Sequence, residues 1–324
     1  MLVRFWGTRG SLPVAATASI VQDKVAHALL AASGRSFADI EEARSFARSE
    51  LDFAISGTFG GATTCVEIEA GDPANGDAFI LCDMGSGLRG FGLDAMRRCA
   101  AGHARVYHFF LSHLHWDHIM GFPFFVPAFD PNADIVIHSG HEDAEEALRR
   151  QQEEISFPVK FDWLRAKIEF RTLKVGETYQ IGAVQVELME QHHSHSSFGY
   201  RFTDAEGKVA VFSTDSEHKL DRMEGEADVE QFFRAADLVI CDTMYSLADS
   251  VSMKEDWGHS SNIVAIDLCH GARAKRLALF HHEPVYSDAD IARMHAESVR
   301  YEELTREHDP LEVLCAYDGL EVSL

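Results

Sequence analysis

The chain of 324 residues is long enough for one large domain or two small ones, and its hydrophobic content of 46% supports a substantial core. Its formal net charge of −23 opposes extended contact with nucleic acid or an anionic membrane, although a small anionic substrate can still bind at a local metal centre. The six cysteines form no Cys-x-x-Cys pair, and neither a signal-peptide pattern nor a membrane-length apolar run is present, so we expect a cytoplasmic protein with reduced thiols.

The N-terminal part predicts one strand followed by two helices. Residues 2–6 have the pattern of a strand and lead into a glycine-containing turn. From about residue 15 to residue 56, apolar residues recur at helical spacing, and Ser36 is the expected cap of the second helix, with Asp39 at its third position. We expect this helical hairpin to pack against the rest of the protein. A lid over the functional site and a contact between subunits are the alternatives.

Strand patterns resume at residues 58–64, 65–69 and 78–82, and the last of these ends in Asp83 and a glycine turn. The next apolar strand, predicted for residues 106–111, is followed at once by four potential metal ligands. These are His113, His115, Asp117 and His118.

Their spacing predicts two neighbouring metal positions. His113 and His115 are two residues apart and share one face while the backbone is extended. Asp117 and His118 follow the bend and can point to a second position. Neutral imidazoles with a carboxylate suit zinc, and also manganese or iron(II). A loop that is rich in histidine by chance is the alternative, but so many ligand-type residues directly after a strand argue against it.

Two later strands also end in ligand-type side chains. The apolar run at residues 209–212 leads to Asp215, a carboxylate that can bind two cations through its two oxygens. The apolar run at residues 276–280 leads to His281 and His282, and strand alternation alone leaves the choice between them open. After residue 133, further strands are predicted at 134–138, 168–170, 184–188 and 198–202, and a surface helix at 142–155.

The pattern His-x-His-x-Asp-His at residues 113–118 resembles the signature of the metallo-β-lactamase-fold hydrolases. The resemblance implies an α+β fold, a four-layer αββα sandwich with a metal pair at one edge of its two sheets. It covers nearly all of the chain except residues 15–56, which we interpret as a helical insertion in a single domain of residues 1–324. It also implies that Asp83 orients a ligand histidine, with a turn-capping aspartate as the alternative.

The same resemblance completes two sets of ligands. In related sequences the ligand histidine lies six residues before the glycine of a Gly-Tyr-Arg element, which favours His193 over His192 and His195. Similarity to the ribonuclease Z branch favours His281 over His282. The two sets are then His113, His115, His193 and Asp215, and Asp117, His118, Asp215 and His281. They would hold two divalent ions, zinc or else manganese or iron(II), and a water bridging them would act as the nucleophile.

His259 is the expected proton donor, and Asp117 is the second residue for which we expect a catalytic role. His259 precedes a helix that is predicted to run from Asn262 to His270. Ser260 or Ser261 would cap the start of this helix, and Gly271 would end it. The same Gly-His-Ser element occurs in the phosphodiesterase branch of the family, where the histidine contacts the phosphate or protonates the leaving group. A structural loop histidine is the alternative.

Two other segments carry weaker signals. Arg9 is a candidate for contacting a phosphate, although a surface salt bridge is the more expected role for an arginine in a turn. Residues 121–125 are apolar, and we expect them to pack on the sheet rather than line the mouth of a pocket.

Taken with the resemblance, these residues predict a binuclear metal-dependent phosphodiesterase acting on a small cyclic nucleotide or cyclic phosphate. A carboxylic ester, lactone or thioester hydrolase would use the same metals without needing His259. A non-catalytic metal-binding sensor is a second alternative, which the complete ligand sets oppose. Processing of tRNA is disfavoured by the negative charge and by the lack of a basic arm. β-Lactamase activity is disfavoured because that branch generally lacks the histidine found here as His118.

Overall fold

The computed structural model describes residues 1–70, 78–218, 226–250 and 257–324. The strands of one sheet are β1 (Leu2–Gly7), β2 (Cys65–Glu69), β3 (Phe79–Cys82), β4 (Val106–Leu111), β5 (Asp134–Ser139), β6 (Lys167–Thr172) and β14 (Glu321–Ser323). Those of the other are β7 (Thr178–Ile181), β8 (Val184–Gln191), β9 (Ser197–Thr203), β10 (Val209–Ser213), β11 (Leu238–Asp242), β12 (Arg276–Phe280) and β13 (Glu312–Cys315). The helices are α1 (Ala18–Ala31), α2 (Ile40–Ser49), α3 (Phe53–Ser56), α4 (Leu88–Ala100), α5 (Trp116–Ile119), α6 (Ala144–Gln151), α7 (Glu226–Phe233), α8 (Leu247–Ser250), α9 (Asn262–Ala272) and α10 (Asp288–Thr305).

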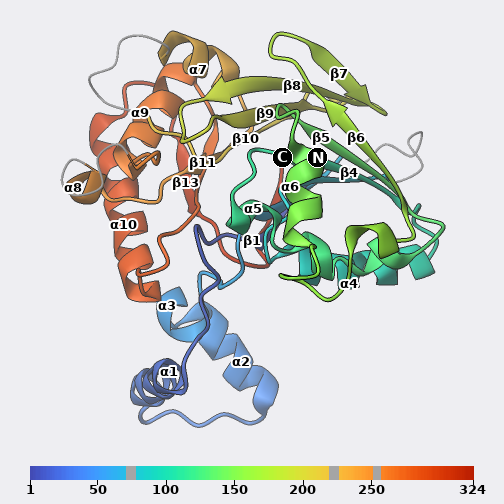
Figure 1. Ribbon diagram of the computed structural model, residues 1–324. Coiled ribbons are helices and arrows are strands. Elements are labelled where there is room, and N and C mark those ends of the chain that lie inside the picture. Colours follow the sequence, from blue (N-terminus) through green and yellow to red (C-terminus); the bar gives the residue numbers. More distant parts are fainter. Residues whose placement is uncertain (71–77, 219–225, 251–256) are drawn as a thin grey trace.

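The two sheets form the inner layers of a sandwich. Within the described ranges each has seven strands, in the orders β14-β1-β2-β3-β4-β5-β6 and β13-β12-β11-β10-β9-β8-β7. Figure 1 shows helices α4 and α6 beside the first sheet and α7, α9 and α10 beside the second. This arrangement confirms the predicted α+β, four-layer αββα sandwich. That residues 1–324 form a single domain stays a prediction.

The core between the sheets explains why the strands alternate or are wholly apolar. Phe5, Phe110, Tyr200, Phe212 and Phe280 meet there, all without exposed surface. Central strands such as β10 are covered on both faces, by the other sheet and by helices, and therefore read as unbroken apolar runs.

The central strands also determine where the functional residues gather. Strands β3 to β6 are mutually parallel, and so are β10 to β13. Parallel strands end at the same edge of a sheet, and ligands in such sheets bind outside the carboxyl ends of the strands. The polar residues that follow β3, β4, β10 and β12 are therefore brought to one edge of the sandwich.

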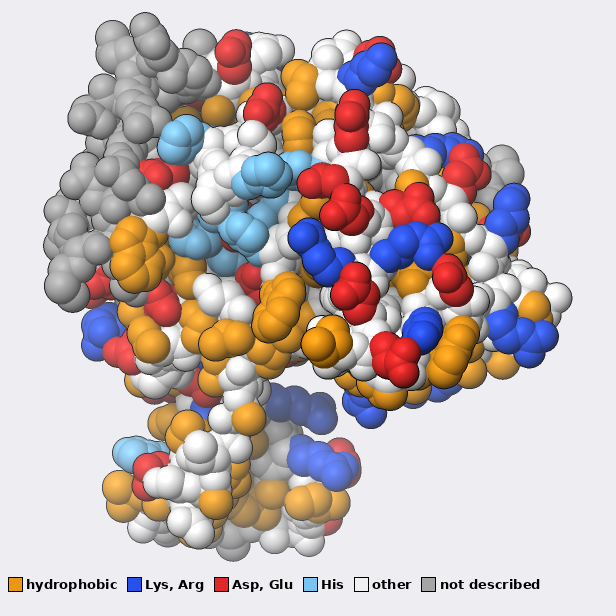
Figure 2. Space-filling view, in the orientation of Figure 1, with side chains coloured by type: hydrophobic (Ala, Val, Ile, Leu, Met, Phe, Trp, Pro, Cys, Tyr) orange, Lys and Arg blue, Asp and Glu red, His pale blue; other side chains and the backbone are white. Residues whose placement is uncertain are grey.

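The helical insertion contacts the sandwich mainly at its base. Helix α1 has no buried residue, and Leu29 is 67% exposed. Figures 1 and 2 show the insertion as a lobe projecting from the body. Near its attachment the ring of Phe53 packs on Tyr317, with centroids 4.7 Å apart, and Lys24 Nζ lies 2.7 Å from Asp288 Oδ2. The expected packing is therefore found at α3 and Lys24 rather than along the apolar face of α1.

Two boundary predictions at the helices are wrong. Helix α2 is capped by Asp39 and not by Ser36, because the carboxylate of Asp39 accepts a hydrogen bond from the Glu42 amide at 2.9 Å. Helix α9 continues through Gly271 to Ala272 and ends where Arg273 adopts a left-handed conformation with φ 54°. Its predicted cap is confirmed, since Ser261 accepts from the Val264 amide.

One predicted strand is absent, and one predicted helix is shorter than expected. The segment 58–64 contains bends instead of a strand, because Gly60 has a positive φ and Asp318 accepts hydrogen bonds from the amides of Gly61 and Ala62. The helix expected at 142–155 covers only α6, which ends at Gln151. Among the described helices, none has both the length and the apolar character needed to cross a bilayer.

Candidate metal centre

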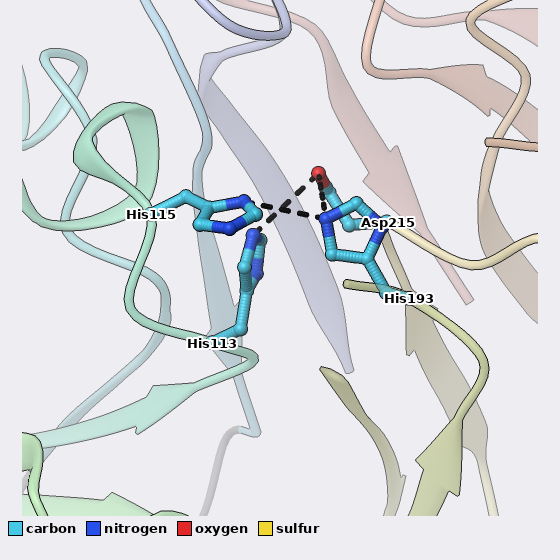
Figure 3. A group of neighbouring side chains, drawn as sticks. All are labelled: His113, His115, His193 and Asp215. Carbon is cyan, nitrogen blue, oxygen red and sulfur yellow. Dashed lines mark hydrogen bonds and ion pairs between the residues drawn. The ribbon is translucent and has the colours of Figure 1, made fainter. Parts of the chain in front are cut away.

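All seven side chains predicted as ligands lie at one edge of the sandwich. They form two groups, and within each group the donor atoms lie within 4.8 Å of one another; Asp242, His259 and His281 form a third, smaller cluster by the same measure. The first group is His113, His115, His193 and Asp215, and the second is Asp117, His118, Asp215 and His281. Figure 3 shows the first group, with the three imidazoles and the carboxylate pointing toward a common position.

The first group is rich in nitrogen, with His113 and Asp215 buried, His193 half-buried and His115 exposed. His115 Nδ1 lies 3.3 Å from His193 Nε2, and Asp215 Oδ2 lies 3.7 Å from Nε2 of both His113 and His193. Burial lowers the pKa of His113 well below its ordinary value, which favours the neutral imidazole that binds metals. Among the described residues, no hydrogen-bond partner reaches the buried His113 Nε2. A divalent cation would satisfy this orphaned atom.

The second group contains two buried carboxylates. His118 Nε2 lies 3.2 Å from both Asp117 Oδ2 and Asp215 Oδ1, and His281 Nε2 lies 3.3 Å and 3.1 Å from the same two atoms. Burial alone would lower the pKa of His118, but the nearby carboxylates of Asp215 and Asp117 raise it well above its ordinary value. This excess of negative charge in a buried place is what a divalent cation neutralises. Both groups therefore fit a metal.

Asp215 is shared by the two groups. Its Oδ2 faces the first group and its Oδ1 faces the second. Asp215 has a left-handed backbone, with φ 48°, as do Asp83 and His281 at 60° and 61°. Such conformations are unfavourable for residues other than glycine and are concentrated at functional sites. Here each one follows a buried strand and turns the side chain toward the site.

Asp83 contacts a member of the second group directly. Its Oδ2 accepts a hydrogen bond from His118 Nδ1 at 2.7 Å, and its two oxygens also accept from the amide and hydroxyl of Ser112 at 2.7 Å. Because Nδ1 is engaged in this way, Nε2 of His118 is directed toward Asp117 and Asp215. This geometry supports the orienting role predicted for Asp83 over that of a turn cap.

The structure also separates the histidines that were alternatives as ligands. His192 and His195 are exposed, and the His195 ring stacks on His141, with centroids 5.9 Å apart. His282 is fully buried, and its Nε2 hydrogen-bonds the carbonyl of Ala316 at 2.8 Å. His193 and His281 are the members that lie within the two groups.

His259 lies beside both groups and is held by an aspartate that the sequence interpretation missed. Its Nδ1 is 2.8 Å from Asp242 Oδ2 and 4.0 Å from Asp215 Oδ2. Burial alone would lower the pKa of His259, but Asp242 raises it, to about 9. Asp242 ends β11, so the available signal was an apolar run finishing in a carboxylate, as at Asp83 and Asp215.

Arg9 and the segment 121–125 have structural roles. Arg9 is 2% exposed and donates hydrogen bonds to the carbonyls of Gly60, Glu283 and Tyr286 at 3.0–3.1 Å. Arg9 Nη2 also lies 4.0 Å from Asp288 Oδ1, so the expected salt bridge is present but buried rather than at the surface, and the engaged guanidinium opposes contact with a phosphate. The packing expected for residues 121–125 is confirmed by the full burial of Phe122 and Phe125.

Several solved structures have an architecture similar to that of this chain. No curated protein matches the sequence. The solved structure of the metallo-β-lactamase fold protein YhfI from Bacillus subtilis is similar, with a TM-score of 0.61 and 15% identity over 99% of this chain and 98% of that one. A diphosphatase from the PhnP family has a TM-score of 0.59 and 17% identity, covering 100% and 97%. The short form of human tRNase Z has a TM-score of 0.57 and 18% identity, covering 100% and 99%. At these identities the likeness shows the fold.

The family comparison extends over most of the sandwich. Residues 79–282 match the family described as the beta-lactamase superfamily domain. This range begins with β3 and ends just after His281, so it contains every member of the two groups. Family and side-chain geometry together indicate a hydrolase that binds divalent metal. The chain therefore belongs to this family, the beta-lactamase superfamily domain.

Proposed function

We propose that the protein is a binuclear metallohydrolase that cleaves phosphodiester bonds in a small anionic substrate such as a cyclic nucleotide or cyclic phosphate. The observation that carries the proposal is the pairing of His259 with Asp242. His259 Nδ1 lies 2.8 Å from Asp242 Oδ2 and 4.0 Å from Oδ2 of Asp215, the carboxylate that both groups share. Hydrolysis of an unactivated phosphodiester requires a proton donor for the leaving oxygen, whereas many carboxylic esters and lactones can be opened without one.

The two groups would hold one divalent ion each. The first, with three imidazoles and one carboxylate, suits zinc best, and the second, with two of each, also suits manganese or iron(II). When bound, such ions lower the pKa of a coordinated water and offset negative charge on the substrate. Asp215 would belong to both coordination spheres, and Asp117 to the second.

The remaining chemistry is assigned to His259 and Asp242. Because Nδ1 of His259 faces Asp242, Nε2 is the atom available to donate a proton to the leaving oxygen. Asp242 is fully buried, and it also accepts a hydrogen bond from the Met244 amide at 3.0 Å, which fixes the carboxylate in place. It therefore holds His259 in one orientation and stabilises the imidazolium.

Names of similar structures agree with this chemistry. One of them is described as a diphosphatase and another as a tRNase Z, and these names denote enzymes that act on diphosphates and on tRNA. The net charge of −23 favours a small substrate over a tRNA in this protein.

A substrate panel tests the proposal. Protein loaded with zinc or manganese should hydrolyse cyclic nucleotides and bis-p-nitrophenyl phosphate, and chelation of the metal should abolish turnover. Faster turnover of lactones, thioesters or carboxylic esters would replace the proposal by its first alternative. Bound metal without turnover of any of these substrates would instead favour the second alternative, a non-catalytic metal-binding sensor.

The proposal also includes a role for the helical insertion in contacts between subunits. The exposed apolar face of α1 supports a contact between subunits through residues 15–56. The mass of the assembly in solution should then fall in Leu29→Lys, whereas equal monomeric masses for wild type and variant would remove this idea.

The location of the protein is part of the same proposal. The six cysteines are all free and buried, which supports a reducing, cytoplasmic environment.

A further inference from the structure

The backbone of Gly258 connects a residue of the first group with the loop that carries His259. Its carbonyl accepts a hydrogen bond from His193 Nδ1 at 2.8 Å. A carbonyl can only accept, so His193 carries its hydrogen on Nδ1, and its Nε2 is left for a metal. Gly258 has φ 84°, and a Cβ built there would lie 2.4 Å from His193 Nδ1. Only glycine allows this close contact.

The amide of Gly258, on the other side of its Cα, is held by Glu217. Gly258 N donates to Glu217 Oε2 at 3.2 Å, and Glu217 is 6% exposed. The backbone of Glu217 makes a second connection, because its amide donates to the carbonyl of His192 at 2.8 Å. One residue therefore contacts the chain on both sides of the His193–Gly258 hydrogen bond.

The loop that carries Glu217 is continuous with the shared carboxylate, since Asp215 lies two residues before it. A further link joins the same two loops: Ser260 Oγ donates to the carbonyl of Ser216 at 2.5 Å and accepts from the amide of His218 at 3.0 Å. The segments carrying Asp215, His193 and His259 are thus connected by hydrogen bonds from residues that are not themselves in the two groups.

We propose that Glu217 is a positioning residue that acts through the backbone of Gly258, setting the ring of His193 for metal binding and the place of His259 relative to the substrate. The proposal rests on the proposed function for the role of His259, whereas its consequence for metal binding does not depend on the substrate. Residues that orient a ligand histidine typically change metal affinity by about 10–100-fold when they are removed.

Three variants separate reach from charge. Glu217→Gln keeps the length of the side chain and an oxygen that can accept from Gly258, so it should behave like the wild type. Glu217→Asp keeps the charge but is one methylene shorter, and Glu217→Ala removes the acceptor. Zinc affinity, measured by competition with a chromophoric chelator, should fall by about 10-fold or more in the Asp and Ala variants.

A second measurement follows His259. The ratio of turnover on a cyclic nucleotide to turnover on bis-p-nitrophenyl phosphate should fall in Glu217→Asp and Glu217→Ala and be restored in Glu217→Gln. If the wild type cleaves no phosphodiester, the proposed function fails, while zinc affinity still decides the role of Glu217.

A buried glutamate elsewhere provides the control. Glu302 is 2% exposed, lies in α10 and is paired with Arg306, so Glu302→Ala should lower the melting temperature without changing zinc affinity. Wild-type zinc affinity in all Glu217 variants would overturn the proposal. So would a loss in Glu217→Gln with retention in Glu217→Asp, because charge and not reach would then matter. An equal loss in Glu302→Ala would show a non-specific effect. If Glu217→Ala does not fold, the contrast between Gln and Asp decides.

Discussion

Replacing Asp215 by alanine should weaken metal binding at both groups together and reduce turnover by about 10³-fold or more. The two oxygens of Asp215 face different groups, so a single substitution removes one ligand from each. Metal ions contribute several kcal/mol of transition-state stabilisation, and each 1.36 kcal/mol corresponds to a factor of ten in rate. Zinc content after dialysis and steady-state turnover measure the two effects.

Asp117→Ala is the matched comparison. Asp117 belongs only to the second group, so this variant should keep metal in the first group while losing most of its turnover. If Asp215→Ala retained as much metal as the wild type, Asp215 would not be a shared ligand. A loss confined to one site would contradict the bridging role as well.

His259→Ala should reduce turnover of a cyclic nucleotide by about 10²- to 10⁴-fold, the usual contribution of a positioned acid. Its effect on bis-p-nitrophenyl phosphate should be much smaller, because p-nitrophenolate is a stable anion that leaves without protonation. Metal content should not change, since His259 belongs to neither of the two four-residue groups and its Nδ1 is engaged by Asp242. Parallel assays of the two substrates with metal analysis of the same preparation test this prediction.

Asp242→Asn provides a graded control for His259. The amide keeps the shape of the side chain but removes the charge that faces His259 Nδ1 at 2.8 Å. We expect a loss in the same direction that is also larger for the cyclic nucleotide than for the activated diester. Equal losses on both substrates in His259→Ala would instead indicate a role in binding or structure.

The sequence predicted the centre best where the signal was local. His113, His115, Asp117 and His118 directly follow one apolar strand, so their proximity needed no knowledge of the tertiary structure. The choice between His281 and His282 needed the family resemblance. His281 has a left-handed backbone, and the strand alternation that would otherwise predict its direction ends at that point.

Residues whose role depends on distant partners were not found. Asp242 has the same local signal as Asp215, but its partner His259 lies 17 residues later and is brought close only by the fold. Glu217 likewise acquires its role through Gly258, 41 residues away. Neither contact leaves a trace in hydrophobic periodicity.

For the fold, local patterns predicted the central strands β4, β10 and β12 but missed β11, and they predicted the cap of α9 but not that of α2. Helix α10 was not predicted, although Ser287 and Asp290 form a capping box that marks its start. The apolar spacing in α1 correctly indicated a helix. Periodicity shows which residues share a face, however, and not what covers that face, and in this structure Leu29 and its neighbours stay exposed.

The most direct test of the binuclear centre is the metal content of the wild-type protein. Protein saturated with zinc or manganese and freed of excess ion should carry close to two equivalents per chain, by elemental analysis against an accurate protein concentration. Two equivalents would agree with the ligand groups that share Asp215. A single equivalent, even when excess metal is supplied, would contradict them.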